Sequence, residues 1–132
     1  MKIQLGCAAA VLMLLCGCAS SRCEWSDPYA GQTSTDGNPV IANIEGMNSG
    51  VFLFYAIPLW SGQEGRPNRG LYYSLENHVR PKHIRRMFDI YCEKLSGNRV
   101  EDLVYEERSN PWWGLFIFWK RSIHGRAVIT GD

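Results

Sequence analysis

Three histidines, His78, His83 and His124, are the residues of this chain best suited to bind a metal ion. His78 and His83 are five positions apart, and Pro81 between them breaks any common helical face. Zinc sites need further ligands at set spacings, and the sequence has no CxxC, HExxH or His-x-His pattern. The sequence therefore predicts no metal site, and the histidines are expected to be solvated or capping side chains.

Candidates for covalent or acid–base catalysis are equally weak. Cys92 falls on the apolar stripe of an expected helix, where burial disfavours the reactive thiolate. No serine has a G-x-S-x-G context. The acid pairs Glu101-Asp102 and Glu106-Glu107 lie in an expected strand, where neighbouring side chains point to opposite faces. We therefore expect that the protein is not an enzyme.

Four of the five cysteines, Cys7, Cys16, Cys18 and Cys23, fall within the first 23 residues. Residues 3–17 (IQLGCAAAVLMLLCG) follow Lys2 and are apolar or small except for Gln4. This run is shorter than the roughly 20 residues that span a bilayer, and it is typical of a secretory signal peptide.

The end of this run, Leu15-Cys16-Gly17-Cys18, resembles the lipobox of bacterial lipoproteins. The resemblance implies removal of residues 1–17, a diacylglycerol thioether on Cys18 and acylation of its amine. This covalent lipid is the only cofactor-like group expected. Ala19, in place of Asp, implies sorting to the periplasmic leaflet of the outer membrane rather than retention at the inner membrane. An uncleaved anchor helix and an ordinary secretory signal are the alternatives.

Cys23 and Cys92 are the two thiols left after such processing. An even pair in an oxidising compartment favours a disulfide, which would be worth about 4 kcal/mol in the chain-entropy model. The alternative is that Cys92 is a free cysteine packed in the helix's apolar face.

Arg80, Lys82, Arg85 and Arg86 form a basic cluster with His83 at the start of the expected helix. This cluster suits contact with lipid phosphates or other envelope anions, because each cation is worth about 1 kcal/mol near an anionic surface. A solvated helix face is the alternative.

Trp112, Trp113 and Trp119 bracket an apolar run of eight residues, WWGLFIFW, too short to span a bilayer. In an alternating strand one side-chain set packs inward, and the other must be covered or exposed. We expect these aromatics to be buried between layers, or to contact a protein partner, a second copy or the membrane interface.

The elements that must position these residues are read from their periodicity. We expect strands over 39–46, 51–60, 71–75, 99–107, 112–119 and 122–130, with turns at 48–50 and 109–111 and an exposed loop at 61–70. Apolar residues recur at helical spacing from Pro81, and Gly97 is placed to cap the helix. Residues 18–38 are rich in Ser, Thr, Gly, Asp and Asn, and predict a flexible lipidated tether.

These elements predict an α+β fold, with a mostly antiparallel sheet of four to six strands packed against one amphipathic helix over 39–132. The chain has 132 residues, enough for one domain, with 14 basic and 13 acidic residues. This balance argues against nucleic-acid binding. The chain from about residue 40 also resembles small TRL-like bacterial lipoproteins, on "IPLWSG", the helix and "GNRVEDLVYEE". That resemblance implies a fold and an address, and no activity.

The sequence thus predicts a membrane-anchored, periplasm-facing lipoprotein that is a binding or structural module of the cell envelope. A periplasmic enzyme, or a subunit of one, is the alternative.

Overall fold

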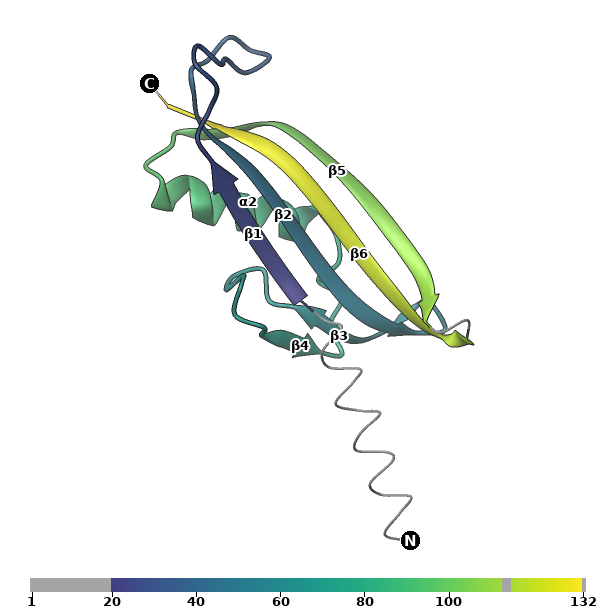
Figure 1. Ribbon diagram of the computed structural model, residues 1–132. Coiled ribbons are helices and arrows are strands. Elements are labelled where there is room, and N and C mark those ends of the chain that lie inside the picture. Colours follow the sequence, from purple (N-terminus) through teal and green to yellow (C-terminus); the bar gives the residue numbers. More distant parts are fainter. Residues whose placement is uncertain (1–19, 113–114, 132) are drawn as a thin grey trace, which may run out of the picture.

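The computed structural model describes residues 20–112 and 115–131, with the backbone alone for Trp112 and Leu115 (Figure 1). The expected signal segment 1–17, the expected lipidation residue Cys18, and Trp113 lie outside the described residues. In chain order the elements are β1 (Ser20–Ser26), β2 (Val40–Leu53), β3 (Ile57–Gly62), β4 (Tyr72–Ser74), α2 (Pro81–Lys94), β5 (Arg99–Trp112) and β6 (Leu115–Thr130).

The strands form one antiparallel sheet in the order β4-β3-β2-β6-β5, and β1 also pairs with β2. β1 and β3 use successive lengths of β2: β1 pairs with Asn43–Ser49, and β3 with Gly50–Leu53. The predicted α+β class, with a mostly antiparallel sheet and one helix in the described chain, is confirmed.

The turn predicted at 48–50 is wrong, because β2 continues through it and ends only at Leu53. Asn48 is fully buried, and its amide donates hydrogen bonds to the carbonyls of Gly62 and His78. Gly50 leaves room for the backbone of Trp60, whose carbonyl oxygen lies 2.5 Å from where a Cβ would sit. Asn48 and Gly50 therefore allow neighbouring segments to approach β2 closely, although their residue types are typical of a turn.

The turn predicted at 109–111 is also wrong. β5 runs unbroken to Trp112, and β6 joins the two strands expected over 112–130 into one. Pro111 fits because β5 is an edge strand of the sheet, where a missing N–H costs least.

The flexible tether predicted over 18–38 is wrong for residues 20–26, which form β1. Ser21 and Cys23 alternate with exposed residues and point into the protein. The free edge of β1 is covered by Asn68, whose side chain bonds both the N–H and the C=O of Cys23, and whose own N–H donates to Ser21. Residues from Ser20 onward therefore belong to the sheet, within the segment predicted to be a tether.

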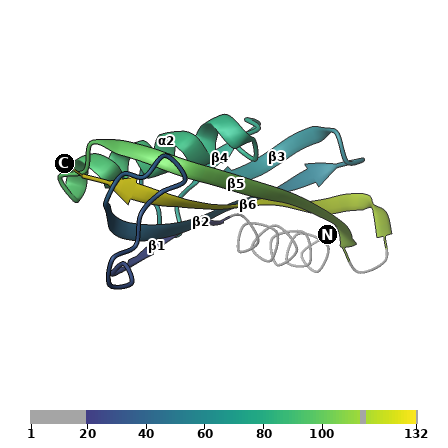
Figure 2. The ribbon, with the colours of Figure 1, turned by 90° about the horizontal axis from the view of Figure 1, so that it is seen from above.

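α2 lies on one side of the sheet (Figure 2). Its Ile84, Met87 and Phe88 are fully buried and belong to the same core cluster as Ile44 of β2 and Ile123 of β6. The helix ends near the predicted residue, but the residue with positive φ is Ser96 (φ 56°) rather than Gly97. Gly97 serves packing, because a Cβ there would collide with Ile129.

No helix within residues 20–112 and 115–131 has the length and apolar character needed to cross a membrane.

Candidate functional site

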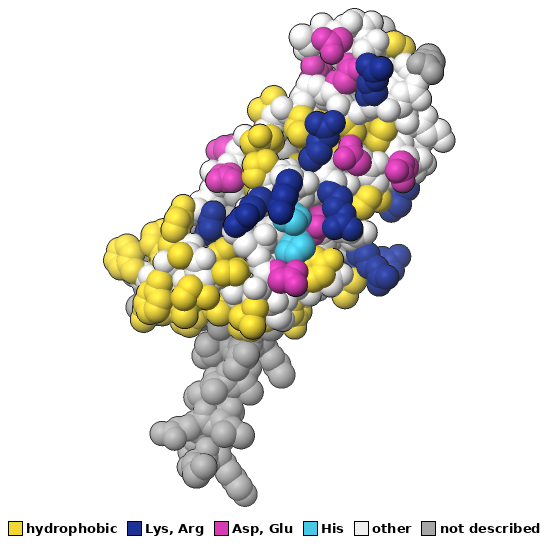
Figure 3. Space-filling view, turned by 180° about the vertical axis from the view of Figure 1, so that it is seen from behind, with side chains coloured by type: hydrophobic (Ala, Val, Ile, Leu, Met, Phe, Trp, Pro, Cys, Tyr) yellow, Lys and Arg dark blue, Asp and Glu magenta, His cyan; other side chains and the backbone are white. Residues whose placement is uncertain are grey.

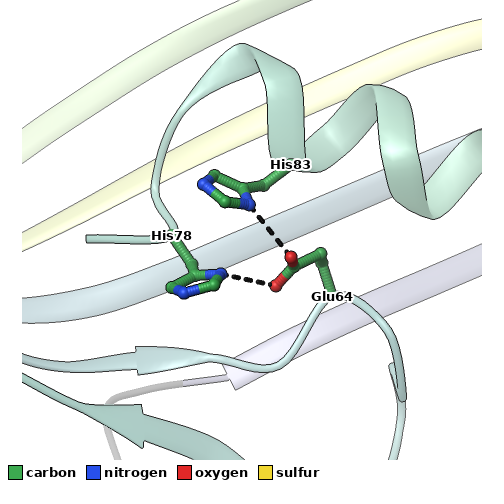
Figure 4. Close-up of side chains that lie close together, drawn as sticks. All are labelled: Glu64, His78 and His83. Carbon is green, nitrogen blue, oxygen red and sulfur yellow. Dashed lines mark hydrogen bonds and ion pairs between the residues drawn. The ribbon is translucent and has the colours of Figure 1, made fainter. Parts of the chain in front are cut away.

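A carboxylate and two imidazoles converge where the β3–β4 loop meets the start of α2 (Figure 4). Glu64 comes from the loop after β3, His78 from the segment between β4 and α2, and His83 from the first turn of α2. Pro81 starts the helix between the two histidines, so the chain turns and brings both rings to the same carboxylate. We call these three residues the Glu64 cluster.

Both histidines contact Glu64 through Nδ1. His78 Nδ1 lies 2.9 Å from Oε2, and His83 Nδ1 lies 2.9 Å from Oε1. Arg86 Nη1 reaches Oε1 at 3.4 Å. The Glu64 side chain is fully buried, while those of His78 and His83 are 14% and 12% exposed. A buried carboxylate is thus held by three nitrogen groups, which offset much of the cost of removing its charge from water.

These contacts determine the charge states. Burial works to raise the pKa of Glu64, but hydrogen bonds from His83, its own backbone amide and His78 outweigh burial, so that the pKa lies below its usual value. Burial lowers the pKa of His83, and the neighbouring Glu64 opposes this shift only in part. At neutral pH the cluster therefore contains an ionised Glu64 and a neutral His83.

Surrounding contacts fix the position of His78. Its ring stacks on Tyr73, with centroids 4.2 Å apart, and its Nε2 lies 2.8 Å from Glu76 Oε2. The backbone N–H of His78 donates to the hydroxyl of Ser61, and its backbone carbonyl accepts from the side-chain amide of Asn48. His78 is therefore held by residues of three strands, β2, β3 and β4, and by Glu76 in the segment after β4.

Sequence reasoning missed this cluster for two reasons. Glu64 lies in the segment predicted to be an exposed loop, yet it is buried. His78 and His83 share no helical face, as predicted, but they need none, because one precedes the helix and the other begins it. The one sequence pattern that could have indicated the cluster is a pair of histidines on either side of Pro81, the first residue of the helix. His124 lies elsewhere, on β6, with Nε2 3.4 Å from the Ser122 hydroxyl.

A second candidate feature is an exposed apolar surface at the ends of two hairpins, which we call the aromatic end. It comprises residues from the β2–β3 turn, the start of β3 and the start of β6, namely Phe54, Tyr55, Ile57, Phe116 and Ile117, which are 45–73% exposed. Figure 3 shows hydrophobic side chains gathered at one end of the molecule. The two hairpins are joined there, because Phe54 N–H donates to the carbonyl of Ile117.

The aromatic end contains an unfavourable backbone. Phe54 and Tyr55 have φ of 49° and 71°, and the N–H of Ala56 bonds to the carbonyl of Leu53. Two successive left-handed residues make a type I′ turn, which favours Asn-Gly. Bulky residues in this conformation cost about 1–2 kcal/mol each. Stability alone does not explain aromatic side chains at this tip.

Of the predicted tryptophans, only Trp119 has a described side chain. It is half-buried against the core, and its Nε1–H donates to the carbonyl of Phe116. The side chains of Trp112 and Trp113 lie outside the described part of the chain. The exposed aromatic side chains at this end of the described chain are instead Phe116, Phe54 and Tyr55. Away from the aromatic end, further aromatic side chains are exposed, namely Trp25, Tyr29, Tyr72 and Tyr105.

The predicted basic cluster lies at the start of α2, and all four residues are exposed. Two are paired with acids: Arg85 with Asp89 at 3.6 Å, and Arg86 with Glu64. Histidine side chains reach the surface among Lys and Arg on this side of the molecule (Figure 3). Contact with an anionic surface stays a prediction.

Cys23 and Cys92, the predicted pair, are free thiols and both buried in the core cluster. In the structure, both residues are therefore free cysteines packed among apolar side chains. Burial raises the pKa of Cys23 to about 12, and it also raises the pKa of Cys92.

The sheet face away from α2 has a shallow hollow of about 610 Å³. Charges of both signs line it, from Arg22 and Glu24 on β1, Glu45 on β2 and Arg126 on β6. The Glu64 cluster does not line this hollow.

No protein-family model, no curated protein and no solved structure matches this chain.

Proposed function

We propose that this protein is a lipoprotein of the cell envelope, anchored through Cys18 in the periplasmic leaflet of the outer membrane, and that it works there as a binding or structural module. Its aromatic end lies in the interface of that membrane. The lipobox-like ending Leu15-Cys16-Gly17-Cys18 supports the anchor. The proposed membrane contact rests on the position of Ser20, which lies close in sequence to Cys18 and pairs with β2 near the aromatic end.

Ser20 belongs to β1 and lies two residues after Cys18, and two residues reach at most about 7 Å. Ser20 pairs with Ser49, four residues before β2 ends at Leu53, a distance of about 13 Å along the strand. The lipid attachment point is therefore within about 20 Å of the aromatic end. A short connection keeps the domain against the bilayer, and the hairpin ends are near enough to enter it.

The chemistry of this end matches a membrane interface. Its rings are amphipathic or apolar, and aromatic residues concentrate at the level of the lipid headgroups. Arg121 lies directly behind them, with its guanidinium 4.6 Å from the Phe52 ring centroid and 4.8 Å from that of Tyr55. Lys120 beside it is exposed. Cations behind an apolar tip suit lipid phosphates above an apolar layer.

We also infer that α2 is amphipathic and that its apolar face packs on the sheet. Its buried residues Ile84 and Phe88 support this, because both lie where a Cβ on Gly125 of β6 would have to sit.

Fractionation of the producing bacterium tests the anchor. The wild-type protein is expected in the outer-membrane fraction and to take up labelled palmitate. Cys18→Ser is expected to prevent labelling and to release the protein, and globomycin is expected to cause the precursor to accumulate. A Cys18→Ser variant that stays fully membrane-bound contradicts the proposal.

A periplasmic enzyme, or a subunit of one, is the second candidate, and the Glu64 cluster is the observation that favours it. Its ionised carboxylate and neutral His83 are groups that general acid–base catalysis uses. Hydrolysis of chromogenic esters and phosphoesters by wild type, lost in Glu64→Gln, is expected if this candidate is right. Equal rates for both proteins would remove it.

A further inference from the structure

The Glu64 cluster has the donor set of a transition-metal site. We propose that Glu64, His78 and His83 bind one divalent transition-metal ion, and that the ion is zinc. Two imidazole nitrogens with one carboxylate suit zinc, in the three-ligand type of site that leaves one coordination position for water. This proposal does not depend on the lipid anchor.

The spacing of the ligand atoms fits such an ion. One nitrogen or oxygen from each residue lies within 4.8 Å of the others, and the two nearest N···O separations are 2.9 Å. Zinc binds nitrogen and oxygen at 2.0–2.2 Å, which places neighbouring tetrahedral ligands roughly 3.3 Å apart. Small rearrangements of side chains therefore suffice to admit the ion. Because His78 and His83 are slightly exposed, the ion has a path from solvent.

His78 gives an independent indication. Its Nδ1 faces the Glu64 carboxylate and its Nε2 faces the Glu76 carboxylate. A neutral imidazole has one N–H and can donate to only one of the two, whereas a protonated ring donates to both. A metal ion at Nδ1 satisfies both contacts with a neutral ring, because Nε2–H donates to Glu76 while Nδ1 and Glu64 both bind the cation. A carboxylate behind a ligating histidine is the common outer contact of zinc sites.

Three charged groups bear on the ion. Glu64 attracts it directly and Glu76 attracts it through His78, while Arg86 competes for Glu64 Oε1. The Arg86 side chain is 64% exposed and can move into solvent when the ion binds. Zinc therefore replaces an arginine contact and the hydrogen bonds of two histidines.

Zinc binding to the mature lipidated protein, purified in detergent and stripped with EDTA, tests the site. Equilibrium dialysis is expected to give one equivalent of zinc. His78→Ala and His83→Ala are each expected to weaken binding by about 100-fold or more, and Glu76→Gln by about 10- to 100-fold. His124→Ala, the matched control on β6, is expected to bind as wild type does.

X-ray absorption of the zinc-loaded wild type keeps the test independent of whether the variants fold. Two imidazole ligands with oxygen, and no sulfur, are expected. Sulfur ligation would overturn the proposal, because it would place the ion on Cys23 or Cys92. Failure of wild type to retain zinc, or full retention by a folded variant lacking both His78 and His83, would overturn it as well.

Discussion

Tyr55 and Trp119 meet edge to face across the ends of two hairpins, with ring centroids 5.3 Å apart and planes at 83°. One residue is in the β2–β3 turn and the other is on β6, so this contact ties the turn to the body of the sheet. It holds exposed aromatic side chains in place at the end of the molecule nearest the expected anchor. Such a surface is preorganised for contact rather than loosely attached.

Phe54→Asn separates function from stability at this tip. Asn tolerates the left-handed conformation that Phe54 adopts, and the substitution removes a ring that is 62% exposed. We expect the free energy of unfolding to rise by about 0.5–1 kcal/mol in urea denaturation. The unlipidated Cys18→Ser protein is expected to keep only weak binding to anionic vesicles at high lipid concentration, and Phe54→Asn to weaken it further, because an inserted Phe side chain contributes about 1.5–3 kcal/mol. Ser109→Ala, a change on β5 outside the aromatic end, is the control. A Phe54→Asn protein that is less stable but binds vesicles equally well would contradict the account.

Gly125→Ala tests the packing of α2 on the sheet. A Cβ at Gly125 would lie 2.5 Å from Ile84 Cγ2 and 3.2 Å from Phe88, and such overpacking costs about 1–3 kcal/mol. Gly65→Ala is the control, since nothing lies within 4 Å of its Cβ position. Thermal unfolding is expected to show a lower Tm for Gly125→Ala only. Equal Tm values would show that the helix does not contact the sheet there.

Glu64→Ala, measured in the presence of EDTA, tests how much the Glu64 cluster contributes to stability without a metal ion. The substitution leaves His78 and His83 without their shared acceptor, and we expect the free energy of unfolding to fall by about 2 kcal/mol. Glu106→Ala removes an exposed carboxylate that pairs with the exposed Arg108, and should leave stability unchanged. If Glu64→Ala and Glu106→Ala have the same free energy of unfolding, the contacts of Glu64 with His78 and His83 do not stabilise the fold.

Cys23 gives a pH-dependent prediction. With a pKa of about 12 in the folded protein and about 8.5 when unfolded, its thiolate fraction at pH 9 should fall about a thousandfold on folding. Iodoacetamide should therefore label Cys23 slowly in buffer and rapidly in urea. Because the folded pKa is raised, the stability from burying this thiol is complete below about pH 8.5 and is lost as pH rises toward 12. A disulfide with Cys92 would instead leave no thiol to label in urea without reductant.

The sequence predicts the local chemistry of the fold better than its long-range geometry. Helical periodicity and Pro81 define α2 to within a few residues. The sequence predicts a turn at Asn48 and an exposed loop at Glu64, because the residue types there are polar or small. Both are buried because their partners, Gly62, His78 and His83, come from other segments. A pattern read along the chain contains no information on such partners.

The same limit applies to the candidate sites. The spacing of His78 and His83 around Pro81 predicts no shared helical face, and the Glu64 cluster exists only because three segments converge. The apolar run before Trp119 predicts burial between layers or, as the alternative, exposure, and its Phe116 and Ile117 are exposed. The other members of the aromatic end, Phe54, Tyr55 and Ile57, come from a segment that the sequence predicts to be one strand over 51–60.

Nitroxide labelling of the lipidated protein in vesicles tests the membrane contact of the aromatic end most directly. Phe116→Cys places a label on that end, and Asp36→Cys places one in the loop at the opposite end of the sheet (Figure 1). The account predicts that the label at position 116 collides mainly with oxygen dissolved in the bilayer, and the label at position 36 mainly with a water-soluble nickel complex. Two labels that both respond mainly to the nickel complex would contradict it.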